Sequence, residues 1–341
     1  MKIAQVAPII ERVPPKKYGG TERVVYALTE ELVRRGHKVT LFASGDSITS
    51  ASLRSVYPKC LREAKIKDLY GLNVYTLMNV GEAYQVQEKF DIIHDHTGHV
   101  GLPLANISKT PAVITMHGAF DVEMRKIFKS FGKPHIVTIS QMQAKHAPDI
   151  NHIGTVYNGL DMEGFPFSEK AGDYLLYVGR ISMEKGVHHA IQTAINLNLP
   201  LIIAAKLEKV DLPYFEEYVG PYLSDTIRWI GEVDEAERNE LMSKALAFLH
   251  PVTWPEPFGL TLIESMACGC PVVAFNKGSI SEVVAHGKTG FVVSDLGEMI
   301  EAVANINQID RKECRRHALE NFNVQKMTDG YEKIYQKILK S

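Results

Sequence analysis

Short apolar runs alternate with helical patterns along almost the whole chain. In the first half, five of these runs predict β-strands, at residues 2–7, 38–43, 91–94, 112–117 and 135–140. Residues 22–35 predict a helix, because apolar side chains recur on one face and Gly36 follows. The strand runs lack the polar alternation of half-exposed strands, which is typical of parallel sheets covered on both faces.

The pattern breaks into Gly, Pro and polar residues at 158–173 and then restarts. Further strands are expected at 174–179, 201–205, 226–231, 245–250 and 271–275, with helices at 186–197, 234–244, 259–267 and 279–285. The sequence therefore predicts an α/β protein of two doubly wound domains, 1–160 and 161–323, which face a cleft. Ligands are expected in that cleft, at the carboxyl ends of the strands.

The tail, 324–341, predicts one amphipathic helix that crosses back to the N-terminal domain. Its expected inner face is formed by Met327, Tyr331, Ile334, Tyr335 and Ile338.

Composition narrows the function classes. The chain has 38 basic and 40 acidic residues and a net charge of −2, so nothing draws the whole protein to nucleic acid. No run reaches the ~18 apolar residues that a membrane span needs, and the first ten residues do not resemble a signal peptide. The four cysteines are too scattered for a disulfide framework. A cytoplasmic location is expected.

Two loops contain groups that suit an anionic ligand. Gly19 and Gly20 precede the first helix without a G-x-G-x-x-G or G-x-x-x-x-G-K-[ST] pattern, so they indicate either close backbone approach to a ligand or an ordinary loop. Arg180 and Lys185 share one strand-to-helix loop. They suit a diphosphate, although two solvated basic residues explain the spacing as well.

The stretch WPEPFGLTLIE, at 254–264, contains two carboxylates. Pro257 suits the first turn of a helix expected from about Phe258 to Ala267, which would put Glu256 and Glu264 on one side, two turns apart. Two glutamates on one side of an otherwise apolar helix favour a ligand site over ordinary surface positions.

Histidines follow two strands of the first domain. In His94-Asp95-His96 the two imidazoles would point in opposite directions if the strand continued, and no D-x-D or H-E-x-x-H motif supports a metal. No metal site is predicted. His117, at the end of the next strand, is a candidate for substrate binding or polar catalysis.

The ordered set of motifs resembles the retaining nucleotide-sugar glycosyltransferases of family 4, in the glycogen-synthase-like superfamily. The set runs from Gly19-Gly20-Thr21-Glu22 through Asn158-Gly159-Leu160-Asp161, Arg180 with Lys185, and Glu256-(seven residues)-Glu264 to Gly278-Ser279-Ile280-Ser281-Glu282 and Gly287-Lys288-Thr289-Gly290-Phe291. The resemblance extends from residue 2 to about residue 335. It implies two Rossmann-like domains of GT-B type, the first for the acceptor and the second for the nucleotide-sugar donor.

The resemblance also implies residue roles. Arg180 and Lys185 would grip the donor diphosphate, Glu256 would meet hydroxyls of the transferred sugar, and Glu264 would bind the ribose. Donor-binding residues would be Gly20, Arg180, Lys185, Val233, Glu256, Phe258, Gly259, Leu260 and Glu264. Catalytic residues would be Glu256, His117, Arg180 and Lys185, and acceptor-side candidates would be Gly19, His96 and Asn158. The chain departs from the family at Ala204-Ala205-Lys206-Leu207, where Ala-Gly-x-Gly is common, and at Ser281, where proline is common.

The implied reaction moves a hexose, glucose from UDP-glucose first, to a hydroxyl with retention of configuration. Front-face attack is expected, with no metal ion and no cofactor beyond the donor. A nucleotide-sugar 2-epimerase or hydrolase on the same fold, and a regulatory protein that only binds nucleotide sugar, are the alternatives.

The acceptor stays open between a small molecule, a glycan and a lipid. Basic stretches at 59–67 and 125–133 indicate either peripheral contact with the inner membrane face or solvated helix faces. The sequence leaves the oligomeric state open.

Overall fold

The structure is a computed structural model and describes residues 1–17, 19–64, 66 and 69–340. The chain divides into two compact units. Unit 1 contains residues 1–161 and the C-terminal helix, and unit 2 contains residues 162–323. The division after Asp161 lies one residue beyond the predicted boundary.

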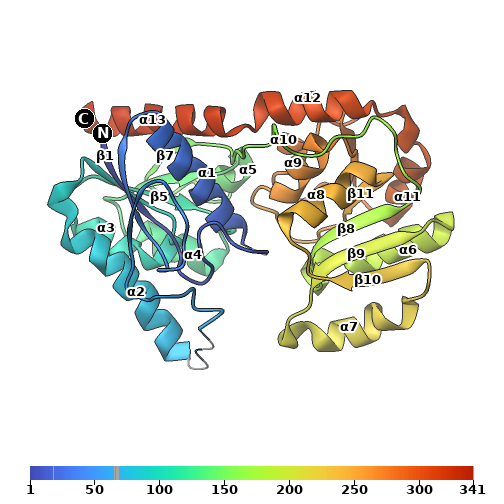
Figure 1. The fold of residues 1–341 in the computed structure, drawn as a ribbon, viewed down its shortest axis with the longest axis horizontal. Helices are drawn as coiled ribbons and strands as arrows, with labels where there is room; N and C mark the ends of the chain where they lie inside the picture. Colours follow the sequence, from blue (N-terminus) through green and yellow to red (C-terminus); the bar gives the residue numbers. More distant parts are fainter. Residues whose placement is uncertain (18, 65, 67–68, 341) are drawn as a thin grey trace. The chain divides into compact units, whose positions relative to one another are not determined.

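Unit 1 is built on a seven-stranded sheet in which every pair of neighbouring strands is parallel. In order across the sheet its strands are β3 (Ser52–Arg54), β2 (Lys38–Phe42), β1 (Lys2–Val6), β4 (Ile92–Asp95), β5 (Ala112–Met116), β6 (His135–Thr138) and β7 (His152–Thr155). Its helices are α1 (Gly20–Arg34), α2 (Leu69–Gln85), α3 (Leu102–Ile107), α4 (Val122–Lys129), α5 (Gln141–Lys145) and α13 (Val324–Lys340), with 3₁₀ turns η1 (Gln87–Lys89) and η2 (Gly98–Val100). Figure 1 shows these elements in blue to green, with α13 in red.

Unit 2 has a six-stranded parallel sheet. In order its strands are β10 (Ile227–Gly231), β9 (Leu201–Lys206), β8 (Leu175–Arg180), β11 (Ala247–His250), β12 (Val272–Phe275) and β13 (Gly290–Val293). Its helices are α6 (Val187–Leu197), α7 (Leu212–Tyr218), α8 (Glu235–Lys244), α9 (Leu260–Ala267), α10 (Ile280–Val283), α11 (Leu296–Ala304) and α12 (Arg311–Asn321), with 3₁₀ turns η3 (Met183–Lys185), η4 (Lys209–Asp211), η5 (Gly220–Tyr222) and η6 (Ile306–Gln308).

Both sheets have the Rossmann strand order, in which the direction of travel reverses between β1 and β4 and between β8 and β11. Every residue of β4, β5, β11 and β12 is buried, which is why these strands are apolar runs without alternation. The predicted fold class of two doubly wound α/β domains is confirmed.

The strands at 52–54, 152–155 and 290–293 were not predicted, because all three are short edge strands that contain polar or glycine residues. Helix α9 begins at Leu260, two residues later than predicted. Gly259 precedes it with φ of 81°, a left-handed conformation that ends any helical run there, so Pro257 is not in its first turn.

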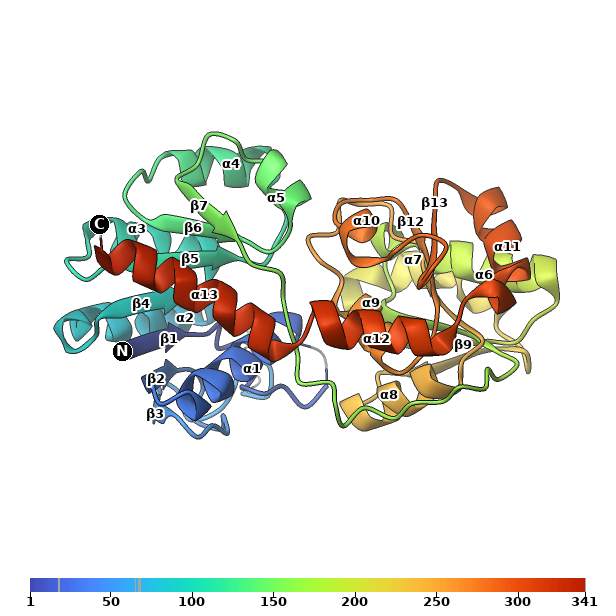
Figure 2. The ribbon, with the colours of Figure 1, turned by 90° about the horizontal axis from the view of Figure 1, so that it is seen from above.

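The C-terminal helix α13 belongs to unit 1 and packs beside α1 (Figure 2). The five residues predicted for its inner face are all buried, and Tyr331 and Tyr335 have no exposed surface. Arg35, directly after α1, donates hydrogen bonds to three groups of α13. These are the carboxylates of Asp329 and Glu332, each at 2.6 Å, and the carbonyl of Gln325.

No helix within the described ranges combines the length and apolarity that a membrane crossing requires.

Arg35→Ala should lower the free energy of unfolding by about 1 kcal/mol, because it removes a mostly covered guanidinium that pairs with Glu31, Asp329 and Glu332 at once. Arg34→Ala is the matched control: its side chain is 66% exposed and, among the described residues, pairs with Glu31 alone, so its loss should be clearly smaller. Urea denaturation followed by circular dichroism measures both. Equal losses would contradict the role given to Arg35.

Candidate functional site

A buried ion pair lies at the reversal point of the second sheet. Lys185 is the last residue of η3, after β8, and Glu256 follows β11, the neighbouring strand. Lys185 Nζ donates to Glu256 Oε2 at 2.6 Å, with side chains 21% and 10% exposed. Open α/β sheets bind ligands at this place, beyond the carboxyl ends of the two strands where the order reverses.

Two more side chains face the Glu256 carboxylate. Trp254 Nε1 donates to Oε2 at 3.0 Å, and Lys185 Nζ lies 4.8 Å from the centre of the Trp254 ring. His250 Nε2 lies 3.9 Å from the same oxygen. Burial alone would raise the pKa of Glu256, but the charge of Lys185 and hydrogen bonds from Lys185 and Trp254 hold that pKa below its usual range. Burial lowers the pKa of His250 to about 4.

The site thus holds an ammonium, a carboxylate and a neutral imidazole in one buried group. Such a group can bind an anion and accept hydrogen bonds from hydroxyls.

Two glycines allow the loops that carry this pair to pack together. A Cβ on Gly278 would lie 2.2 Å from the carbonyl oxygen of Glu256, and Ser279 N donates to that oxygen at 2.9 Å. A Cβ on Gly186 would lie 2.1 Å from the carbonyl oxygen of Pro251. Both glycines have positive φ, so side chains are excluded there by conformation as well as by space.

Arg180 shares the loop of Lys185 but has different partners. Its guanidinium pairs with Glu184, and its Nε lies 3.6 Å from Asp211 Oδ2. The Tyr177 hydroxyl donates to the carbonyls of Arg180 at 2.9 Å and Lys185 at 3.3 Å and so anchors both ends of the loop. Sequence reasoning missed Tyr177, which looked like an ordinary strand residue.

Glu264 lies in a separate place from Glu256. It is fully buried on α9 and accepts from Arg238 of α8 at 2.9 Å. Glu256 precedes that helix, so the expectation of two glutamates on one helix side is wrong. Arg238 was not predicted, because α8 is polar and gives no periodic sign of which residues turn inward.

The remaining donor-side candidates surround α9 and β10. Phe258 is buried with its ring 5.8 Å from that of Phe322, Gly259 caps α9 and Leu260 begins it. Val233 is buried between β10 and α8.

At the reversal point of the first sheet, the expected divergence of two histidines is wrong. The strand ends at Asp95, and the rings of His94 and His96 lie 3.9 Å apart. His94 bonds Tyr335 at 2.6 Å and Thr115 at 2.7 Å, while His96 bonds Gln5 at 2.8 Å and His117 at 2.9 Å. Both nitrogens of each ring are occupied, so neither imidazole offers a lone pair to a metal ion.

The glycine and asparagine candidates also lie in unit 1. Gly20 begins α1, and Gly19 caps it with φ of 150°. A Cβ on Gly19 would lie 2.7 Å from Pro15, so this glycine is required by the turn itself. Asn158 is 3% exposed, and its Oδ1 has no hydrogen-bond partner within the described part of the chain.

One further group of possible metal ligands occurs among the described residues, at Asp46, Cys60 and Glu63. Glu63 is paired with Lys16 at 2.7 Å, and Asp46 accepts from the backbone of Cys60 at 3.0 Å. Burial raises the pKa of the Cys60 thiol, which disfavours the thiolate that a metal requires. The group does not fit a metal site.

The basic stretches are only partly described. Lys65 and Lys67 of the first lie outside the described residues. In the second, Lys126 pairs with Glu123 and Lys129 with Asp149, and all four side chains are more than half exposed. These two lysines are solvated ion-paired residues.

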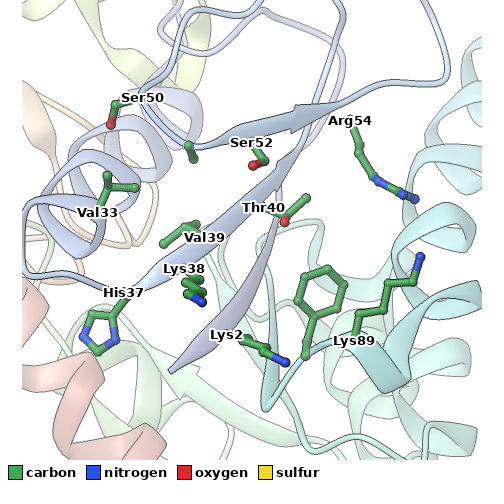
Figure 3. Close-up of a pocket in the computed structure, with 12 residues that line it drawn as sticks. Lys2, Val33, His37, Lys38, Val39, Thr40, Ser50, Ser52, Arg54 and Lys89 are labelled. Atoms are coloured by element: carbon green, nitrogen blue, oxygen red, sulfur yellow. The ribbon is translucent and has the colours of Figure 1, made fainter.

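A pocket of about 450 Å³ opens at the opposite edge of the first sheet (Figure 3). Its lining includes Lys2, Lys38 and Ser52, which begin β1, β2 and β3. It therefore lies at the amino ends of the strands, away from both reversal points, and is not part of the candidate site.

Two sequence models of known families match the chain. The model described as "Glycosyltransferase Family 4" matches residues 18–163, and "Glycosyl transferases group 1" matches residues 165–325. The chain belongs to glycosyltransferase family 4.

The relatives of this glycosyltransferase are distant. It is 29% identical to a glycogen synthase of Mycobacterium tuberculosis over 59% of its own length and 55% of that protein, so it spans about half of that relative. It is 25% identical to the N-acetyl-alpha-D-glucosaminyl L-malate synthase of Bacillus anthracis, over 94% of its own length and 95% of the relative.

Solved structures share the fold of this glycosyltransferase. A sucrose-phosphate synthase from Thermosynechococcus elongatus matches with a TM-score of 0.82 and 19% identity, over 98% of both chains. Anabaena HepE, solved in complex with UDP-glucose, matches with a TM-score of 0.75 and 19% identity, over 99% of this chain and all of that one.

Gly278→Ala should destabilise the enzyme by at least about 2 kcal/mol more than Gly287→Ala. Both glycines have positive φ, at 66° and 76°, so conformational strain is matched. Only at Gly278 would the new Cβ strike the Glu256 backbone, since nothing lies within 4 Å of the Cβ position at Gly287. Chemical denaturation measures the difference, and equal losses would show that the loops do not pack as described.

Proposed function

We propose that this glycosyltransferase transfers glucose from UDP-glucose to an acceptor hydroxyl, with retention of the anomeric configuration. The observation that carries the proposal is the Lys185–Glu256 pair at the reversal point of the second sheet. In a nucleotide sugar, an anionic diphosphate is bonded directly to a neutral polyol. A cation beside a hydrogen-bond acceptor matches that adjacency.

In this proposal the Lys185 ammonium pairs with the diphosphate, and the Glu256 carboxylate accepts hydrogen bonds from hydroxyls of the sugar. Glu256 is suited to this because its pKa is held below the usual range, so it is a carboxylate at neutral pH. Arg180 lies at the other end of the same loop and adds positive charge. Glu264 and Arg238 support α9 from within, and the ribose contact expected of Glu264 is part of the proposal.

The proposed reaction proceeds on one face of the sugar. The bond between the anomeric carbon and the diphosphate oxygen breaks, the acceptor oxygen bonds to the same carbon, and the acceptor proton passes to the departing diphosphate. Lys185 and Arg180 stabilise the charge that develops on the leaving group. Because these side chains supply that charge, the proposal includes no divalent metal.

UDP-glucose is proposed because HepE, a structural neighbour, was solved with it. The acceptor is proposed only as a hydroxyl compound, since the matched relatives differ in their named products.

Lys185→Met should lower the rate of transfer from UDP-glucose about 100-fold or more, because it removes charge stabilisation at the leaving group. Lys244→Met is the matched control: Lys244 is 63% exposed on α8 and pairs with Glu240, so its rate should be unchanged. Release of UDP with a panel of acceptors measures both. Full activity of Lys185→Met would overturn the assignment.

Wild-type enzyme with UDP-glucose alone tests the reaction class. Little product is expected without an acceptor. An epimerised donor would instead show a 2-epimerase, and rapid release of glucose would show a hydrolase. Transfer should persist in excess EDTA, and its complete loss would contradict the metal-free part of the proposal.

A further inference from the structure

A buried chain of hydrogen bonds connects the C-terminal helix with His117. It begins at Tyr335 of α13, passes through Gln5 of β1 and His96 beyond β4, and ends at His117 beyond β5. Tyr335 and Gln5 have no exposed surface, and His96 is 3% exposed. Candidate roles in catalysis and acceptor binding were predicted for His117 and His96. They do not explain why Tyr335 and Gln5 are bonded to these histidines.

Each imidazole in this chain is neutral. Burial lowers the pKa of His94 and His96 well below the usual range and that of His117 to about 4. A neutral imidazole has one N–H and one lone pair, so a hydrogen bond at one nitrogen determines what the other can do.

The Gln5 amide sets the direction of the chain, because its oxygen only accepts and its nitrogen only donates. Gln5 Oε1 lies 2.8 Å from His96 Nε2, so that nitrogen carries the proton and donates. His96 Nδ1 then has the lone pair and accepts from His117 Nε2 at 2.9 Å. The two rings are 28° from parallel with centres 5.2 Å apart, which fits an N–H···N bond in the ring plane.

Tyr335 holds the amide in that orientation. Gln5 Nε2 donates to the Tyr335 hydroxyl at 3.4 Å, and that hydroxyl gives its own proton to His94 Nδ1 at 2.6 Å. His94 Nε2 then donates to Thr115 at 2.7 Å. The opposite set of proton positions, with every donor and acceptor exchanged, would need the Gln5 amide rotated by 180°. Its oxygen would then face Tyr335 and its nitrogen would face His96.

We propose that Tyr335 and Gln5 are positioning residues that hold His117 in the tautomer with Nε2 protonated and Nδ1 unprotonated. The inference rests on the proposed function for its consequence. The hydrogen bond that His117 makes within the described ranges is through Nε2, and the residue is half-buried, so the Nδ1 lone pair is what the ring presents to a ligand. It can accept from a sugar or acceptor hydroxyl, but it repels a phosphate oxygen, which has no proton to give.

Tyr335 of the C-terminal helix therefore determines, through Gln5 and His96, that His117 favours hydroxyls over phosphate. The side chain that sets it lies more than 200 residues away in the sequence, at position 335.

Two tyrosines of α13 form a matched pair for the activity test. Tyr331 and Tyr335 are both fully buried and lie one turn apart, and each loses one buried hydroxyl on change to Phe. Among the described residues, the Tyr331 hydroxyl bonds Thr115, at 3.1 Å. It connects to His117 through Thr115, His94 and Tyr335 itself, so it lies farther from His117 than Tyr335 does.

Tyr335→Phe should lower kcat about tenfold or more with the KM for the donor little changed, because the Gln5 amide is no longer held. Tyr331→Phe should keep kcat within about twofold while losing a similar amount of thermal stability. Equal kcat values in the two variants would overturn the positioning role.

The tautomer itself is tested without substrate, by NMR of the full chain labelled with ¹⁵N-histidine. His117→Gln identifies the His117 signals. In the wild type, Nδ1 of His117 should show the shift of an unprotonated nitrogen and Nε2 that of an N–H, unchanged from pH 8 to about 5.5. In Tyr335→Phe the two signals should move toward an average of both tautomers.

The reverse pattern, with the proton on Nδ1, would overturn the inference whether or not the enzyme transfers glucose. Absence of any transfer by the wild type, with the expected NMR pattern intact, would count against the proposed function alone.

Discussion

The candidate site of the second unit depends on one buried charge, the carboxylate of Glu256. A carboxylate on a side chain that is only 10% exposed is strongly disfavoured unless cations and hydrogen-bond donors surround it. Lys185 supplies the cation and Trp254 the donor. Gly186 and Gly278 let the neighbouring loops pack against Pro251 and the Glu256 backbone, where a side chain would not fit. The arrangement binds the end of β8 to the end of β11, at the point where a parallel sheet leaves room for a ligand.

The histidines of the first unit are subject to the same requirement, that every buried polar group has a partner, but their partners are neutral groups. Polar residues at the ends of β1, β4 and β5 are removed from water by α13, so each must find a partner inside the unit. The histidine cluster satisfies this by a continuous chain of hydrogen bonds. In this chain each residue determines which nitrogen of the next imidazole carries the proton. A helix at the end of the chain thus completes a site whose other parts come from the first third of the sequence.

Much of the fold could be predicted because its signals are local. Buried parallel strands such as β5 and β12 are uninterrupted apolar runs, and α13 repeats apolar residues with a helical period. Helices α11 and α12 were missed although Asp295 and Asp310 cap them, a signal available in the sequence. The short edge strands were missed for a physical reason, since a strand with one neighbour needs no apolar run.

The sequence by itself determined the two α/β units, the loops that carry Arg180, Lys185 and Glu256, and the family. These features depend on the order of residues along short segments. Only the tertiary structure decided which groups meet: Lys185 with Glu256, Glu264 with Arg238, and His117 with a chain that begins at Tyr335. Such pairings depend on strand order and on close approach of backbones, because partners far apart in the sequence leave no periodic trace in it.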